Sequence, residues 1–177
     1  VLAPYPPNES FPPPAGETSQ KLGPWPPSAA HPFGQDKQGR DELSRVMASL
    51  TSQFKLAPGA EVSIEVDPRT ASPERLRHIR SLGFNRISFG IQDFDPDVQL
   101  AVHRVQSFDS VRDLITAARA LDFESINADL IYGLPKQTPT SFARTIAQIA
   151  ELRPDRIALY AYAHLPQRFK PQRRIVA

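Results

Sequence analysis

From residue 41 onward, hydrophobic residues alternate between strand-like and helix-like spacing. Short apolar runs bounded by turn residues predict four strands, at 62–66, 86–91, 126–132 and 156–163. Apolar residues three and four positions apart predict helices over 43–54, 73–82 and 141–152, a short helix after Asp95-Pro96, and a longer one capped by Ser107 or Asp109. This alternation predicts right-handed crossovers and an α/β fold with a parallel sheet.

The spacing of the strands indicates how much of a domain is present. Predicted strands begin near residues 62, 86, 126 and 156, which fits a stretch of a (β/α) barrel or a doubly wound sheet. Four strands do not close a barrel, and the first has no predicted partner upstream. We therefore expect residues 41–177 to be a partial barrel that is truncated at both ends.

Residues 1–40 differ in composition from the rest of the chain. Ten of the 19 prolines lie in the first 32 residues, and runs of proline interrupt both helix and sheet hydrogen bonding. This segment is expected to be a disordered head, with a PxxP ligand as an alternative. A second alternative is an out-of-frame segment, because codons for Ala29-Ala30-His31-Pro32 can encode Gly-Gly-Thr-Pro in a shifted frame.

Composition excludes several classes of function. The chain has no cysteine, which excludes disulfides, thiol nucleophiles, Cys-ligated zinc and a self-sufficient iron–sulfur cluster. The net charge of +2 gives no basic stripe for nucleic acid. Neither a signal peptide nor a membrane-spanning run is recognisable, so we expect a cytoplasmic protein without a membrane partner. The four histidines lack metal-ligand spacing, and no Walker, GxGxxG or GxSxG motif occurs.

Polar residues occur where each predicted strand ends. Glu65, Gln92, Asp129 and His164 lie in the later half of a strand or just beyond it, and Arg104 is a nearby loop cation. In parallel α/β folds, ligands bind at the carboxyl ends of strands. Alternatively, Glu65 and Asp129 pair with local arginines or backbone amides. The repetition of this placement over four strands favours a shared ligand site. The pattern does not identify the substrate.

Five motifs in a fixed order resemble one family. They are SIEVDPR (63–69), GFNRISFGIQDF (83–94), HRVQ (103–106), NADLIYGLPKQT (127–138) and YAHLPQRF (162–169). They resemble the oxygen-independent coproporphyrinogen III oxidases, which are radical S-adenosylmethionine (SAM) enzymes. Lys136 and Asp67-Pro68-Arg69 favour this family over the related haem-chaperone-like proteins. The resemblance covers about residues 41–175 and implies a (β/α)₆ partial barrel, of which about four of the six strands are present.

The resemblance also implies ligands and site residues. Family members carry a [4Fe–4S] cluster and two SAM molecules, and they oxidatively decarboxylate coproporphyrinogen III, a tetrapyrrole, to protoporphyrinogen IX in haem synthesis. By motif, Glu65 and Ala163 match contacts to the cluster-bound SAM. Gln92, Arg104 and Asp129 match contacts to the second SAM. A monomer is expected.

The chain departs from this family in its metal-binding part. The family's cysteine loop and Gly-rich turn are absent, so the chain is predicted to be catalytically inactive alone. Two other interpretations stay open. One is a non-catalytic module of the same fold that binds SAM, or haem through His164, Tyr160 and Tyr162. The other is an interaction protein that uses its Pro-rich head.

Overall fold

The computed structural model describes residues 10, 34–35, 42–168, 172 and 175. Nearly all of the predicted head, residues 1–40, therefore lies outside the described residues, and the structure does not test it. The chain divides into two compact units, which are described separately. One comprises Val1–Val62 and Glu74–Phe84, and the other comprises Ser63–Pro73 and Asn85–Ala177.

The first unit contains helix α1, Glu42–Gln53, at the predicted position. Its predicted apolar face is only partly correct. Leu43 and Met47 are buried, whereas Val46 and Leu50 are about half exposed. Helical spacing fixes which residues share a face, but not how much of that face another element covers.

Helix α2, Pro73–Ser81, begins at the predicted proline, and most of it belongs to the first unit. Its apolar residues Leu76 and Ile79 are buried. Gly83 follows the helix with a φ of +92°, the left-handed conformation that commonly ends a helix and that glycine adopts without steric cost.

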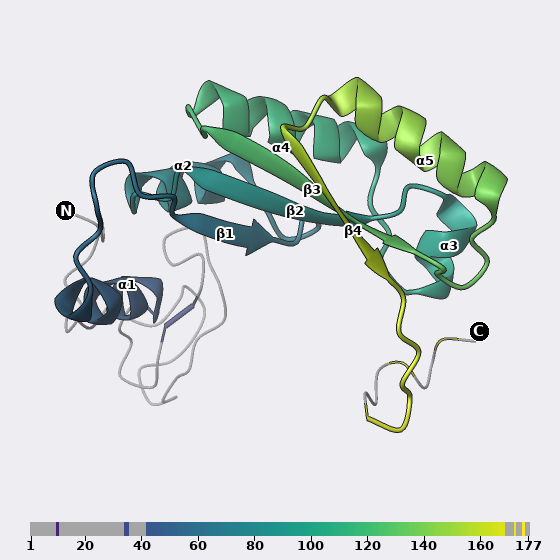
Figure 1. The fold of residues 1–177 in the computed structure, drawn as a ribbon, viewed down its shortest axis with the longest axis horizontal. Helices are drawn as coiled ribbons and strands as arrows, with labels where there is room; N and C mark the ends of the chain where they lie inside the picture. The colour runs from purple at the N-terminus through teal and green to yellow at the C-terminus, as the bar shows by residue number, and fades with distance from the viewer. Residues whose placement is uncertain (1–9, 11–33, 36–41, 169–171, 173–174, 176–177) are drawn as a thin grey trace, which may run out of the picture. The chain divides into compact units, whose positions relative to one another are not determined.

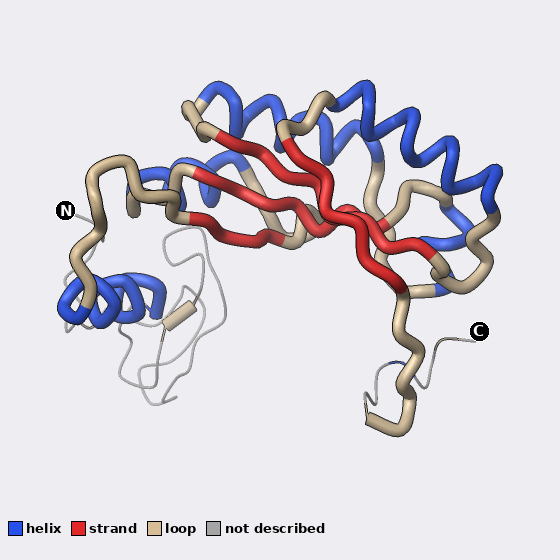
Figure 2. The backbone as a smooth tube through the Cα atoms, viewed as in Figure 1, coloured by secondary structure: helices blue, strands red, loops and turns tan. Residues whose placement is uncertain are grey.

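The second unit contains one parallel sheet of four strands. They are β1 (Ser63–Val66), β2 (Arg86–Gln92), β3 (Ser125–Tyr132) and β4 (Arg156–Ala161). The strands lie side by side in sequence order, β1-β2-β3-β4, as the red segments of Figure 2 show. A doubly wound sheet reverses its strand order at a switch point. The order seen here has no reversal, so it is the order of a stretch of barrel.

Helices α3 (Pro96–Ala101) and α4 (Phe108–Ala120) connect β2 to β3, and α5 (Pro139–Leu152) connects β3 to β4. Helices α4 and α5 lie next to each other on one face of the sheet (Figure 1). Right-handed crossovers that all advance in one direction put their helices on the same face. Phe89 and Leu130 of the strands and Val111 and Ile149 of the helices are fully buried in this unit's core.

Side-chain caps explain where these helices begin. Asp95 caps α3 by accepting from the backbone N–H groups of Asp97 and Val98, and Ser107 caps α4. Helix α5 begins two residues before the predicted Ser141. Thr138 and Ser141 form a capping box, in which each side chain accepts from the other's backbone N–H, so Pro139 takes the first turn.

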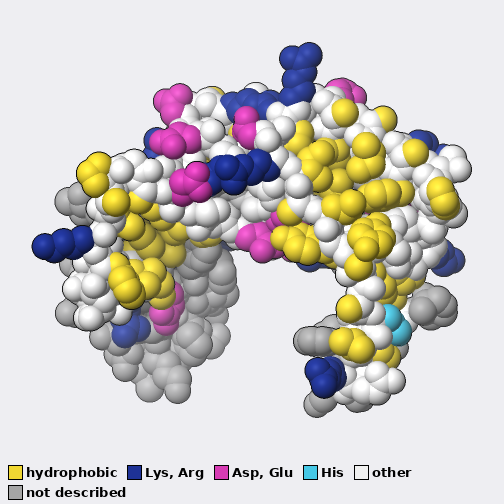
Figure 3. All heavy atoms as spheres, viewed as in Figure 1, with side chains coloured by type: hydrophobic (Ala, Val, Ile, Leu, Met, Phe, Trp, Pro, Cys, Tyr) yellow, Lys and Arg dark blue, Asp and Glu magenta, His cyan; other side chains and the backbone are white. Residues whose placement is uncertain are grey.

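Strand β4 is shorter than predicted and is an edge of the described sheet. It ends at Ala161 rather than 163. Ile157 and Leu159 are more than half exposed, and hydrophobic side chains gather over β4 and α5 on the face seen in Figure 3. Among the described residues, no helix is both long and apolar enough to cross a membrane.

Candidate functional site

The face of the sheet opposite α4 and α5 carries polar residues in register. Glu65 on β1 pairs with Ser88 on β2, which pairs with Asn127 on β3. Two residues further along each strand, and so on the same face, Gly90 pairs with Asp129. Side chains alternate between the two faces of a strand, and paired residues of neighbouring strands share a face. These polar groups therefore line one surface that extends toward the carboxyl ends of the strands.

Gly90 is the point where three of the predicted site residues meet. A β-carbon built on Gly90 would lie 3.0 Å from Gln92 Nε2, 3.5 Å from Glu65 Oε1 and 3.6 Å from Arg104 Nη2. Asp129, the fourth predicted residue, is the register partner of Gly90 on β3. The structure therefore brings together four residues that are far apart in sequence, above the one strand position without a side chain.

Arg104 and Gln92 are held in different ways. Arg104 Nη2 donates to the carbonyl of Gly90 at 3.1 Å and lies 3.3 Å from Asp67 Oδ2. Gln92 has a φ of +69°, next to an irregularity in the pairing of β2 with β3 that places its side chain beside Gly90. In the described part of the chain, Arg104 Nε and Gln92 Oε1 are buried without a hydrogen-bond partner. Unpartnered buried polar atoms are rare, and a bound ligand is one explanation for them.

Asp129 is buried, with only 6% of its surface exposed. Its two carboxylate oxygens accept from Ser88 Oγ at 2.5 Å and from Asn127 Nδ2 at 2.7 Å. Asn127 also donates to Ser88 Oγ at 2.7 Å. Among the described residues, the hydrogen-bond partners of Asp129 are thus a hydroxyl and a side-chain amide, and the alternative that Asp129 pairs with a local arginine or a backbone amide is wrong for this part of the chain. Neutral donors leave the negative charge of the carboxylate available to a ligand.

Two other predicted residues are placed differently from expectation. Glu65 is exposed rather than buried, because β1 is an edge of the described sheet and its polar face is open. Ala163 lies beyond the end of β4, where its carbonyl accepts from Gln172 Nε2 at 2.9 Å. His164 is also exposed, and its Nδ1 lies 3.0 Å from the Tyr162 hydroxyl. Burial therefore supports Asp129 as a site residue and does not support Glu65 or His164.

Sequence reasoning did not assign a role to Asp67 and Arg69. The carboxylate of Asp67 accepts from the Arg69 side chain at 3.0 and 2.6 Å, in a forked arrangement. The Arg69 hydrogen bond is the main reason that the pKa of Asp67 lies below its ordinary value. Burial lowers the pKa of Arg104, an effect that the nearby Asp67 partly offsets. The Asp-Pro-Arg sequence of the motif was the available signal for these two residues. Only the fold shows that they lie next to Arg104 and His103.

A second missed group lies behind the site. Asp93 is 2% exposed and accepts from the Asp95 backbone N–H, Thr145 Oγ1 and Gln137 Nε2 at 2.5 to 2.7 Å. Gln99 donates to the Asp93 carbonyl, at 2.9 Å. These bonds fix the loop after β2, which follows Gln92 directly, to α5 and to the loop that precedes it.

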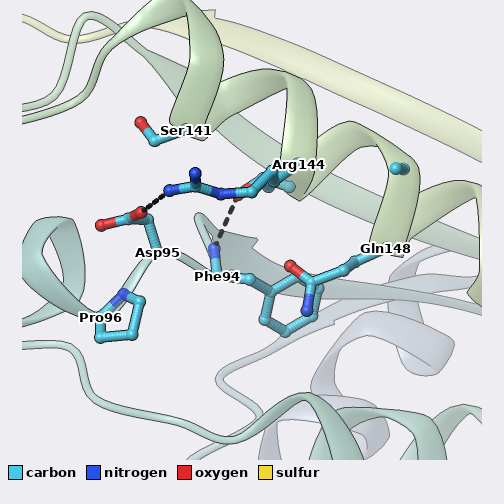
Figure 4. A pocket seen from close by; sticks show the side chains of 8 residues that line it. Phe94, Asp95, Pro96, Ser141, Arg144 and Gln148 are labelled. Carbon is cyan, nitrogen blue, oxygen red and sulfur yellow. Dashed lines mark hydrogen bonds and ion pairs between the residues drawn. The ribbon is translucent and has the colours of Figure 1, made fainter.

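Two hollows outside this cluster offer less chemistry. One, of about 500 Å³, lies between the loop after β2 and α5. Its charged groups, Arg144 and Asp95, pair with each other at 3.0 Å, and Figure 4 shows them facing one another. The other, of about 320 Å³, is at the amino end of the polar face, with Arg86 and Arg156 among its lining residues. Neither contains a predicted site residue.

The described residues do not fit an iron–sulfur cluster. Within the described ranges, no group of three or more His, Cys, Asp or Glu side chains is placed to hold a metal ion, and the whole sequence lacks cysteine. The polar groups around Gly90 do fit SAM. A guanidinium suits its carboxylate, and carboxylates suit its ammonium or ribose hydroxyls.

Comparison with known proteins identifies the class to which this fold and site belong. A sequence profile of the radical SAM superfamily matches residues 34–149. The chain therefore belongs to the radical SAM superfamily. Membership implies SAM and a [4Fe–4S] cluster as the cofactors of the class.

Particular members are similar to this chain over most of its length. The oxygen-independent coproporphyrinogen III oxidase of Pseudomonas aeruginosa is 50% identical over 138 residues, which cover 77% of this chain and 30% of that protein. The solved coproporphyrinogen III oxidase of Escherichia coli is also 50% identical, with a TM-score of 0.71, over 76% of this chain and 31% of that one. The predicted resemblance is confirmed, and the chain spans less than a third of these two relatives.

A more distant structure shares the fold alone. The radical SAM methyltransferase TsrM of Kitasatospora setae is 12% identical, with a TM-score of 0.55, over 70% of this chain and 23% of that one. The partial parallel barrel predicted from the sequence is therefore the barrel of the radical SAM class.

Proposed function

We propose that this chain is a SAM-binding segment of the barrel of an oxygen-independent coproporphyrinogen III oxidase. The observation that carries the proposal is the convergence of Glu65, Gln92 and Arg104 around Gly90, with Asp129 on the neighbouring strand. The 50% identity to curated oxidases supports the same conclusion.

Each group is assigned a part of the ligand. Arg104 binds the carboxylate of one SAM molecule, Gln92 donates to or accepts from its polar groups, and Asp129 accepts from its ribose hydroxyls or ammonium. Glu65 and the backbone of Ala163 contact the other SAM molecule, which is the cluster-bound one in the family. Two unpartnered buried atoms, Arg104 Nε and Gln92 Oε1, support ligand binding at this place.

The complete reaction belongs to an enzyme that also holds the cluster. In such an enzyme, the reduced cluster and SAM supply a 5′-deoxyadenosyl radical for oxidative decarboxylation of a tetrapyrrole propionate. This chain lacks the cysteines for a cluster, so we propose that it is inactive alone and contributes the ligand-binding side of the barrel. A cytoplasmic location and a monomeric state are part of this proposal.

Binding of SAM to the purified chain tests the proposal. We expect saturable binding in equilibrium dialysis, and a loss of about tenfold or more in affinity when Arg104→Ala removes the charged donor. Arg112→Ala is the matched control, because Arg112 pairs with Asp109 on an exposed part of α4. An absence of SAM binding, or equal effects of the two substitutions, would contradict the proposal.

Haem binding is a second candidate, favoured by one observation. The Tyr162 hydroxyl lies 3.0 Å from His164 Nδ1, which orients the exposed imidazole and leaves Nε2 as a possible iron ligand. A haem titration followed by the Soret absorption tests this candidate. It requires a spectral shift in the wild-type chain that His164→Ala abolishes.

A further inference from the structure

Asp67 connects two arginines that come from different loops. It follows β1, and its carboxylate forms a fork with Arg69 while one of its oxygens also lies 3.3 Å from Arg104 Nη2. About 30% of each of these three side chains is exposed, so the cluster is partly shielded from water. An ion pair in such a place is screened less than one on an open surface.

Arg69 ties the same two loops together a second time. Its Nη1 donates to the carbonyl of His103 at 3.0 Å, immediately before Arg104 in the chain. His103 has a φ of +56°, in the left-handed region that few residues other than glycine adopt. The Arg69 bond therefore holds the backbone turn from which the Arg104 side chain extends.

Arg104 is thus restrained at its backbone and at its guanidinium. Nη2 is placed between the Gly90 carbonyl, at 3.1 Å, and Asp67 Oδ2. A long arginine side chain has many rotamers, and fixing one before a ligand arrives lowers the entropy cost of binding. Nε of the same guanidinium is buried and has no hydrogen-bond partner among the described residues.

We propose that Asp67 and Arg69 are positioning residues, which hold the Arg104 guanidinium in the orientation that binds a ligand carboxylate beside Gly90. This inference rests on the proposed function, since it assumes that Arg104 contacts SAM. Asp67 and Arg69 themselves do not need to touch the ligand. Their effect is transmitted through Arg104 alone, which distinguishes this role from a general contribution to stability.

The test compares SAM with decarboxylated SAM, which lacks only the carboxylate. Asp67→Asn preserves the size of the side chain and removes its charge. We expect this variant to bind SAM about tenfold more weakly, with little change for decarboxylated SAM. Asp109→Asn is the matched control, because Asp109 forms an ion pair of 2.7 Å with Arg112 and lies outside the site. We expect this variant to bind both ligands as the wild type does.

A double-mutant cycle separates positioning from direct contact. In an Arg104→Ala background, Asp67→Asn should cause no further loss of SAM affinity. Arg69→Lys retains the positive charge but cannot form the forked pair with Asp67, so it should cause a similar loss of SAM affinity. This variant can replace Asp67→Asn in the test if Asp67→Asn folds poorly. Circular dichroism of each variant confirms folding.

The outcomes separate this inference from the proposed function. Equal weakening for both ligands means a structural role, unchanged SAM binding means that Asp67 does not position Arg104, and tighter SAM binding means that Asp67 competes for Arg104. Any of these results overturns the inference while the proposed function stands. A wild-type chain that binds neither ligand overturns both.

Discussion

Gly90 matters because of what surrounds its missing side chain. Gln92 Nε2, Glu65 Oε1 and Arg104 Nη2 all lie within 3.6 Å of the position a β-carbon would take. The contact of 3.0 Å with Gln92 is tighter than most real β-carbon contacts, although a terminal amide can move. Gly90 does not need a positive φ, so steric space and not backbone conformation accounts for glycine here.

Gly90→Ala should therefore change binding more than stability. The added methyl displaces Gln92 and fills the space beside Arg104, so we expect SAM affinity to fall about tenfold. Replacing glycine within a strand changes the free energy of unfolding by only about 1 kcal/mol. Equilibrium dialysis and urea unfolding on the same preparation separate the two effects. Retained affinity in a folded variant would show that the ligand does not use this space.

The ion pair of Asp67 predicts a pH dependence of stability. Because its hydrogen bond to Arg69 lowers the pKa of the folded state below the ordinary value of 3.8, the carboxylate stabilises the fold above that pH. This contribution is lost as the pH falls through the folded pKa. We expect the unfolding free energy of the wild type to fall more steeply on acidification than that of Asp67→Asn. Parallel pH profiles for the two proteins would contradict the assignment.

At the scale of elements, Asp93 joins three parts of the fold behind the site. It accepts from the loop after β2 through the Asp95 backbone, from the loop before α5 through Gln137, and from α5 itself through Thr145. Since it is 2% exposed, water does not replace these partners easily. The position of Gln92, the neighbouring residue, depends on this anchoring.

Asp93→Ala should thus be strongly destabilising. It leaves the buried Thr145 hydroxyl and the part-buried Asp95 backbone N–H without an acceptor, while Gln137 Nε2 keeps its bond to the Ile131 carbonyl. Each unsatisfied group costs about 1–3 kcal/mol, so we expect a loss of about 2–5 kcal/mol, less than a simple sum because the loop relaxes. Asp97→Ala is the control, since Asp97 is exposed in the first turn of α3 and its loss should cost less than about 1 kcal/mol. Similar urea midpoints for both variants would refute the role of Asp93.

The elements themselves could largely be predicted from sequence, because their signals are local. The helix after Asp95-Pro96 was predicted and is confirmed, and of the two caps predicted for α4 the structure has Ser107. The surroundings of each element could not be predicted in this way. Glu65 is exposed because its strand has an open face, and Asp93 is buried because two distant segments pack on it. Such contacts depend on tertiary structure, which hydrophobic spacing does not encode.

At the scale of the whole molecule, the polar face around Gly90, proposed to bind SAM, occurs in a chain that has no cysteine. Four strands in sequence order provide the polar surface around Gly90. The superfamily's chemistry requires a cluster in addition, and iron–sulfur clusters are held by cysteine thiolates. Since the sequence contains no cysteine, the proposed ligand binding can be tested in this chain apart from cluster chemistry.

This separation gives the last prediction. After anaerobic incubation with iron and sulfide, followed by desalting, the chain should retain no stoichiometric iron and show no cluster absorption or paramagnetic signal. It should bind SAM without cleaving it, because Asp129, Gln92 and Arg104 need no metal to bind a ligand. The measurement pairs iron analysis with chromatography for 5′-deoxyadenosine after adding a strong reductant. Formation of 5′-deoxyadenosine together with bound iron would mean that non-cysteine ligands hold a working cluster. That result would contradict the predicted inactivity, and it would contradict the assignment of this face to ligand binding alone.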